Sequence, residues 1–148
     1  MTDKEYWIDL FTQRAGSIHK RNLRKFGQRM YDRCTQWKNS LVSRSKKHGV
    51  ECKVTLDELR ELMYAFYGIP CKYCGKRMDI HTLVLDHIVP ISKGGTSNID
   101  NLQIICKTSN GMKGSLDEKQ FKMLLDWLKT VPDEVAKDIR TRLARGVV

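Results

Sequence analysis

Two cysteines separated by two residues, in the segment CKYCG at residues 71–75, constrain this chain more than any other feature. A C-x-x-C turn lets two thiolates bind one metal ion, and a structural zinc site normally draws its other two ligands from a second such turn. The matching segment is CKTSNGMKG at residues 106–114, where Cys106 is followed three residues later by Ser109 instead of cysteine. Zinc could be held by three cysteines with a water or His81, or it could be lost and the segment stabilised by packing.

The residues between these two segments predict a β-hairpin. Residues 82–89 are rich in β-branched residues and leucine, which is typical of a strand, and the apolar run 102–105 is short enough to pair back on it. The segment SKGGTSN at residues 92–98 predicts the connecting loop. The polar residues 106–113 then predict a short helix that ends at Gly114.

Helical patterns flank the hairpin on both sides. Apolar residues at intervals of three or four predict an amphipathic helix, on the positions Leu23, Phe26, Met30, Cys34, Trp37 and Leu41. A short alternation predicts a strand over 50–54, and capping boxes predict helices over 55–67 and from Ser115 to about Thr130. Pro132 suits the first turn of a last helix.

Together these patterns predict an α+β, mostly helical fold, in which the hairpin and the short helix lie among flanking helices. A chain of 148 residues suits one domain with one core. We divide it into a basic N-terminal helical region (1–50), a core with the hairpin (51–115) and a C-terminal helical pair that packs on the core (116–148).

Charge is concentrated near the start of the chain. Residues 1–50 hold 12 Lys and Arg against 4 Asp and Glu, which is +8 of the total net charge of +10. Several basic residues fall off the apolar stripe of the first predicted helix, among them Arg21, Arg24, Lys25 and Arg29. Such a surface attracts a polyanion, either nucleic acid or acidic lipid, unless it is simply a solvated face.

Composition also bears on the compartment. No segment approaches the length of apolar residues that would span a bilayer, so no membrane is expected as a partner. Five cysteines is an odd number, which favours reduced thiols over a disulfide framework. We therefore expect a soluble, cytoplasmic protein.

The most reactive side chains adjoin one another in the segment LVLDHIVP at residues 83–90. Asp86 offers a carboxylate for a hard cation, and His87 offers a base with a pKa near neutrality. An Asp beside a His is also common as a surface pair or a local hydrogen bond. Because neighbours in a flat strand point to opposite faces, the functional interpretation requires a twist or a bulge here.

Six features follow one another in a fixed order over residues 70–115. They are the C-x-x-C turn, Asp86-His87, the Lys-Gly-Gly loop, Asn101-Leu102, Cys106, and Asn110 with Lys113-Gly114. In this order they resemble the HNH endonuclease family, in a His-Asn-Asn variant of the kind found in small stand-alone members from phages, mobile elements or restriction systems. The resemblance implies a ββα-metal finger, in which a hairpin and a helix hold one catalytic divalent ion.

The resemblance also implies roles for four residues. His87 would act as general base on the attacking water, and Asp86 would ligate the metal. Asn101 would bond the backbone near His87 and fix the loop. Asn110 stands where a metal-binding histidine is common, and its amide oxygen would be the second protein ligand. Two oxygen ligands favour Mg²⁺ or Mn²⁺, while Cys71, Cys74 and Cys106 remain the candidate ligands of zinc.

These features predict a metal-dependent endonuclease that hydrolyses phosphodiester bonds in DNA, inside a bacterial or phage-infected cell. Lys113, and with it Lys93, could contact phosphates or could be solvated loop lysines. A noncatalytic DNA-binding module of zinc-finger type is the main alternative, and a basic adaptor that recruits other proteins is a third. The pattern is compatible with a monomer or a dimer.

Overall fold

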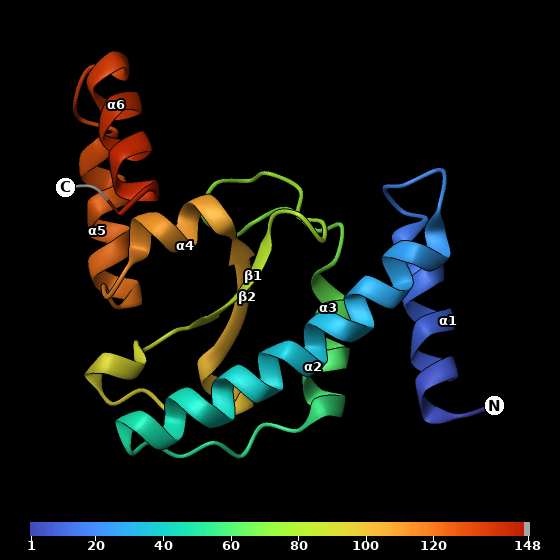
Figure 1. The fold of residues 1–148 in the computed structure, drawn as a ribbon. Helices are drawn as coiled ribbons and strands as arrows, with labels where there is room; N and C mark the ends of the chain where they lie inside the picture. Colours follow the sequence, from blue (N-terminus) through green and yellow to red (C-terminus); the bar gives the residue numbers. More distant parts are fainter. Residues whose placement is uncertain (147–148) are drawn as a thin grey trace.

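The structure, a computed structural model, describes residues 1–146. Six α-helices and one two-stranded antiparallel sheet make up this part of the chain, as Figure 1 shows. The helices are α1 (Asp3–Ala15), α2 (Leu23–His48), α3 (Leu56–Phe66), α4 (Lys107–Lys113), α5 (Glu118–Leu128) and α6 (Asp133–Ala144). The predicted α+β, mostly helical fold is confirmed. Within residues 1–146, no helix combines the length and hydropathy of a membrane-spanning segment.

The hairpin and the helix that follows it form a continuous unit. Strand β1 (Leu83–His87) pairs with β2 (Leu102–Cys106) so that Leu83 lies opposite Cys106 and His87 lies opposite Leu102. Cys106 is also the N-cap of α4, because its side chain accepts the backbone N–H of Ser109. The connecting residues carry two short 3₁₀ helices, η1 (Ile91–Lys93) and η2 (Ile99–Asn101).

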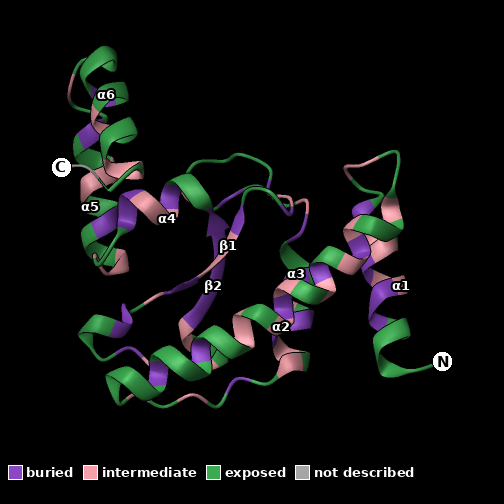
Figure 2. Ribbon diagram, in the orientation of Figure 1, coloured by how far each residue is buried: buried purple, intermediate pink, exposed green. Residues whose placement is uncertain are grey.

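The main core lies between the sheet and helices α1, α2 and α3. Fully buried side chains from all of these elements share one cluster, including Phe11, Met30, Leu59, Leu83 and Ile105. Figure 2 shows both strands largely buried. Residues 1–50 therefore contribute to the same core as the hairpin.

Helix α2 runs along the whole of this body (Figure 1). Its N-terminal half packs on α1, where a Cβ on Gly27 would come within 2.3 Å of Thr12 Oγ1, so the close approach requires glycine. Its C-terminal end packs against η1. The helix continues beyond Leu41, the last residue of the predicted stripe, and the next inward position is the buried Ser45.

Helices α5 and α6 pack on α4 through a second, smaller cluster. Phe121 and Leu128 from α5 and Ala136 from α6 are buried there with Met112 of α4. Gly111 of α4 approaches α6 so closely that a Cβ would lie 2.3 Å from the Ala144 carbonyl oxygen. The outer surfaces of α5 and α6 are exposed (Figure 2).

The structure differs from the predicted elements in three places. The strand expected over 50–54 is an extended segment without a strand partner, bonded instead to the loop by Ser97 N–H donating to the Glu51 carbonyl. The capping box of α5 uses Asp117 and Gln120 rather than Ser115 and Glu118. Helix α1, which the apolar pattern did not predict, begins at a capping box of Thr2 and Glu5.

Candidate active site and cysteine cluster

Asp86, His87 and Asn110 line one cavity of about 360 Å³. The cavity lies between the end of β1, α4 and the loop after β1. Arg44 and His48, at the C-terminal end of α2, complete its wall. The three residues that the sequence analysis proposed for the active site thus line the same cavity. Arg44 and His48, which the sequence analysis did not propose, line it as well.

Asp86 and His87 line this cavity although they are neighbours in a strand. The register of β1 with β2 is regular from Leu83 to His87 and contains no bulge. His87 is the last residue of β1, where the chain leaves the sheet. Both side chains therefore reach the cavity without the bulge that the sequence interpretation allowed, at the point where the chain leaves the sheet.

The carboxylate of Asp86 has two donors on one of its oxygens. Oδ2 lies 3.0 Å from Gln103 Nε2, directly across the hairpin, and 3.0 Å from Lys113 Nζ. The side chains of Gln103 and Lys113 are both buried. These bonds fix the carboxylate and leave Oδ1 as its oxygen for a ligand.

Lys113 corrects one prediction. The sequence placed it among residues that contact DNA phosphate, but its ammonium is fully buried, ion-paired with Asp86 and donating to the His87 carbonyl oxygen at 2.9 Å. Both partners belong to the protein, so Lys113 ties α4 to the end of β1 and presents no charge to a nucleic acid.

His87 is held through one ring nitrogen. Its Nε2 lies 2.8 Å from Ser97 Oγ, and Ser45 Oγ of α2 donates to the same hydroxyl at 2.7 Å. Both serines are buried. Burial lowers the pKa of His87, and the positive charge of Arg44 lowers it further against the opposing effect of Asp86. The neutral imidazole is therefore favoured.

Asn101 fastens the chain that follows His87. Its Oδ1 accepts the Val89 N–H at 2.9 Å, and its Nδ2 donates to the carbonyl oxygens of Val89 and Thr96, at 3.1 and 2.7 Å. Gly95 passes so close that a Cβ would collide with the Val89 carbonyl oxygen. All three side-chain bonds of Asn101 are to backbone atoms, and Asn101 does not line the cavity, so its role is to shape the loop.

The three cysteines of the C-x-x-C turn and β2 gather at the other end of the hairpin. The sulfur atoms of Cys71, Cys74 and Cys106 all lie within 4.8 Å of one another. Ser109 Oγ lies 3.2 Å from Cys106 Sγ and 3.6 Å from Cys71 Sγ, so its hydroxyl occupies a fourth position beside the sulfurs. The bond between the Cys71 and Cys106 side chains lowers the pKa of Cys71 to about 4 and raises the pKa of Cys106, so the thiolate of this pair lies on Cys71.

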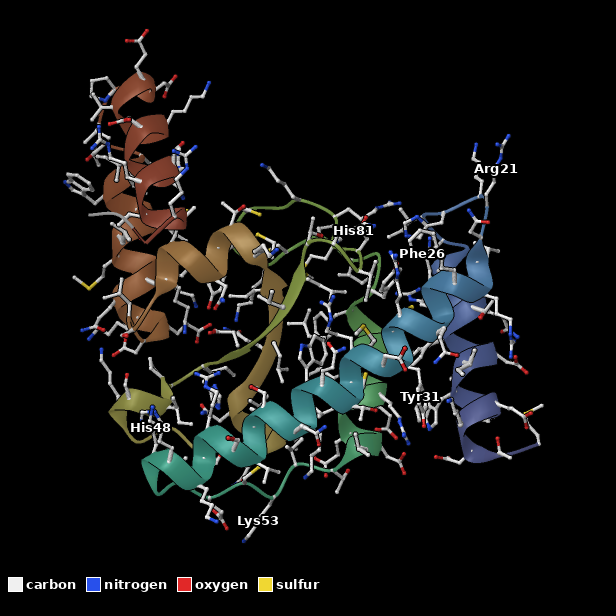
Figure 3. The ribbon with its side chains drawn as sticks, viewed as in Figure 1. Arg21, Phe26, Tyr31, His48, Lys53 and His81 are labelled. Atoms are coloured by element: carbon white, nitrogen blue, oxygen red, sulfur yellow. The ribbon has the colours of Figure 1, made fainter. Side chains whose placement is uncertain are left out.

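His81 is not part of this cluster. Its ring packs edge-on against Phe26, with 6.2 Å between the centroids, beside the N-terminal half of α2 (Figure 3). The alternative in which His81 supplies a fourth zinc ligand is therefore not supported, because its ring lies against α2 and the cysteine cluster does not include it. Ser109 takes that place.

Residues 71–116 match the model of the HNH endonuclease family. We refer to these residues as the HNH segment. A further similarity is to the "CRISPR-associated endonuclease Cas9" of Actinomyces naeslundii, 29% identical over 97 residues, which covers 55% of this chain and 9% of that relative. The chain thus spans a small part of the length of the relative that it matches. The residues of the cavity and of the cysteine cluster lie inside the HNH segment, except for Arg44 and His48 of α2.

The basic residues predicted to bind nucleic acid lie outside the HNH segment. Arg21, Arg24, Lys25 and Arg29 cluster at the N-terminal end of α2, whereas the cavity meets its C-terminal end. Figure 3 shows Arg21 and His48 at these opposite ends. At 1.5 Å per helical residue, Arg24 and Arg44 are about 30 Å apart along α2. Arg24 is paired with Asp9 at 2.7 Å, on an exposed surface.

Sequence reasoning missed five residues around the HNH site, namely Arg44, Ser45, His48, Ser97 and Gln103. Ser45 could have been found, because it falls one turn beyond Leu41 on the inward face of α2, where an apolar residue is expected. Gln103 likewise interrupts an apolar strand that is buried along its full length. The other three depend on contacts between distant segments and left no local pattern.

Proposed function

We propose that this protein is a metal-dependent endonuclease of the HNH type that hydrolyses phosphodiester bonds in DNA. The observation that carries the proposal is the shared cavity, in which a carboxylate, an amide and a neutral imidazole meet within the HNH segment. A relative with the name of an endonuclease supports the class of reaction.

His87 is the general base of the proposed reaction. Its Nε2 is engaged by Ser97, whose oxygen can accept from both the imidazole and Ser45, so Nδ1 carries the free lone pair. Nδ1 takes a proton from a water molecule, the water oxygen bonds to phosphorus, and the bond from phosphorus to the leaving sugar oxygen breaks. The lowered pKa of His87 keeps this nitrogen unprotonated at neutral pH.

Asp86 and Asn110 are the proposed protein ligands of the divalent ion. The donor set fits such an ion, because among residues 1–146 both donors to the Asp86 carboxylate bind Oδ2 and leave Oδ1 for a ligand, and Asn110 brings an amide to the same cavity. Oxygen donors suit Mg²⁺ or Mn²⁺ better than nitrogen-preferring metals. When bound, the ion would stabilise the negative charge that develops on the phosphate and the leaving oxygen.

Supercoiled plasmid provides the test of this function. The protein with Mg²⁺ or Mn²⁺ is expected to relax or linearise the plasmid, and both EDTA and the substitution His87→Ala are expected to stop the cutting. Binding that survives both treatments, with no cutting by the wild-type protein, would instead establish the noncatalytic DNA-binding module.

Ser97 is expected to matter for rate and not for DNA affinity. Replacing a residue that orients a reacting side chain typically costs about 10- to 100-fold in activity, so Ser97→Ala should slow cleavage by about tenfold while the DNA dissociation constant stays unchanged. Ser45→Ala, which removes only the outer bond, should have a smaller effect. Cleavage rates on a labelled duplex, with melting temperatures measured in parallel, check this order.

Ser92→Ala is the matched control for Ser97→Ala. Ser92 lies in the same loop and lines the cavity, but it is exposed and makes no bond to His87. Equal rates for the Ser92 and Ser97 variants, or a lower melting temperature without a slower rate, would assign Ser97 to folding alone.

We further propose that the cysteine cluster binds a structural zinc ion through Cys71, Cys74 and Cys106, with Ser109 beside the fourth position. In tetrahedral zinc with bonds of about 2.3 Å, neighbouring sulfurs lie about 3.8 Å apart. The three sulfurs of the cluster fall within 4.8 Å of one another, and the Ser109 hydroxyl contacts two of them. Either this oxygen or a water bonded to it would complete the set.

Metal content is the readout for this site. The purified protein is expected to hold about one zinc ion per chain, and Cys106→Ala should lose it and lower the melting temperature. Ser109→Cys should hold the ion longer against a chelator, because a thiolate is a better zinc ligand than a hydroxyl. Cys52→Ser, which alters a cysteine outside the cluster, serves as control. A zinc content that is the same in all four proteins would contradict the assignment.

A further inference from the structure

The last turn of α2 forms part of the wall of the cavity, although α2 lies outside the HNH segment. Arg44 and His48 are four residues apart and therefore lie on the same side of the helix. Figure 3 shows His48 beside η1, at the end of α2 that faces the loop after β1. Ser45 anchors this turn through its bond to Ser97. The helix turn that carries Arg44 is thus anchored to the same hydroxyl that holds His87.

Arg44 brings a charge that the protein does not neutralise. In the part of the chain that the structure describes, its guanidinium has no carboxylate within ion-pair distance, unlike Arg24, which is paired with Asp9. Asp86, the carboxylate that lines the cavity, is already paired with the buried Lys113.

An unpaired guanidinium in the wall of a polar cavity fits an anion. Its planar fork of N–H donors matches two oxygens of a phosphate, and it keeps its charge at every pH at which proteins are stable. The imidazoles of His48 and His87 and the amide of Asn110, which also line the space, carry no negative charge that would neutralise this guanidinium. The anion that meets all of these groups together is a phosphodiester.

We propose that Arg44 binds the phosphodiester that lies in the cavity, by donating hydrogen bonds from its guanidinium to the non-bridging oxygens. This inference rests on the proposed function and adds to it a substrate contact from α2. It makes the end of α2 a part of the active site, separate from the basic residues at its beginning.

Two measurements on the full chain test the role of Arg44. The first is binding of a fluorescent DNA duplex in EDTA over a range of salt concentrations, where losing one phosphate contact reduces the slope of log K against log salt by about 0.9. The second is the single-turnover cleavage rate with Mn²⁺, where losing one group that stabilises developing charge costs about 10²-fold. Arg44→Ala should show both effects. Arg44→Lys should restore more of the salt slope than of the cleavage rate, because lysine keeps the positive charge but lacks the paired N–H donors of the guanidinium.

Lys46→Ala is the matched control, because it removes one positive charge from the same exposed turn but about 200° around the helix. It should cleave at the wild-type rate. If Arg44→Ala cleaves as fast as Lys46→Ala, the proposal for Arg44 is overturned while the nuclease stands. If the wild-type protein cuts nothing, the nuclease falls and the salt slope alone decides whether Arg44 contacts phosphate: a reduced slope supports the contact, and a slope equal to that of Lys46→Ala overturns it.

Discussion

Replacing His87 with alanine is expected to slow DNA cleavage by about 10²- to 10⁴-fold, the usual contribution of a positioned general base. The expected loss is large because His87 is the imidazole beside Asp86 and Asn110 in the cavity, and because its ring is buried and fixed by Ser97. Single-turnover rates on an end-labelled duplex with Mg²⁺ give the rate of the chemical step. The affinity for the same duplex in EDTA should remain at the wild-type level.

His81→Ala is the control for this experiment. It removes a second imidazole that lies at the other end of β1, against Phe26, and that does not line the cavity (Figure 3). A rate for His87→Ala equal to the wild-type rate would exclude His87 as the base. Equal losses in both variants would point to folding instead of chemistry.

Lys113→Met is expected to cost about 3–5 kcal/mol of unfolding free energy, because it leaves a buried carboxylate without its counter-charge. The Lys113 ammonium is fully buried 3.0 Å from Asp86 Oδ2 and also satisfies the His87 carbonyl oxygen. After the substitution only Gln103 would remain as a donor to that oxygen. Urea unfolding curves, compared at equal slope, measure the loss.

Two further variants show whether the loss comes from the ion pair. Lys129→Met breaks an exposed pair with Asp126 and should cost less than about 1 kcal/mol. The double variant Lys113→Met with Asp86→Asn should recover part of the lost stability, because the carboxylate left without a partner is also removed. A cost for Lys113→Met as small as that of Lys129→Met would mean that water or a rearranged side chain reaches Asp86.

The hairpin and α4 could be predicted from sequence because their signals are local, whereas Asn110 was placed with Asp86 and His87 only through the resemblance to the HNH family. Two apolar runs, a polar loop and a metal-binding spacing lie within 46 residues, which are also the residues that match the HNH family. The capping box before α1 was equally visible, but its apolar residues are interrupted by acids and the segment gave no clear stripe. The strand over 50–54 was predicted from alternation alone and lacks a partner strand to pair with.

The contacts of the residues that support the site could not be predicted, because the two partners of each contact lie in distant segments. Ser45 and Ser97 are 52 residues apart, and no property of either sequence neighbourhood reveals their bond. Lys113 is a residue whose sequence position predicted the wrong environment. A lysine at the end of a short polar helix is usually solvated, and only the fold determines that this one points inward to Asp86.

The buried Lys113 has a consequence for how the binding of one ligand in the cavity affects the binding of another. Its ammonium balances the Asp86 carboxylate, and Arg44 adds a positive charge at the rim, so the cavity has no excess negative charge of its own to attract a cation. For the proposed divalent ion, the missing negative charge comes from the substrate phosphate. Binding of the ion and binding of DNA are then thermodynamically linked, and each raises the affinity for the other by the same factor.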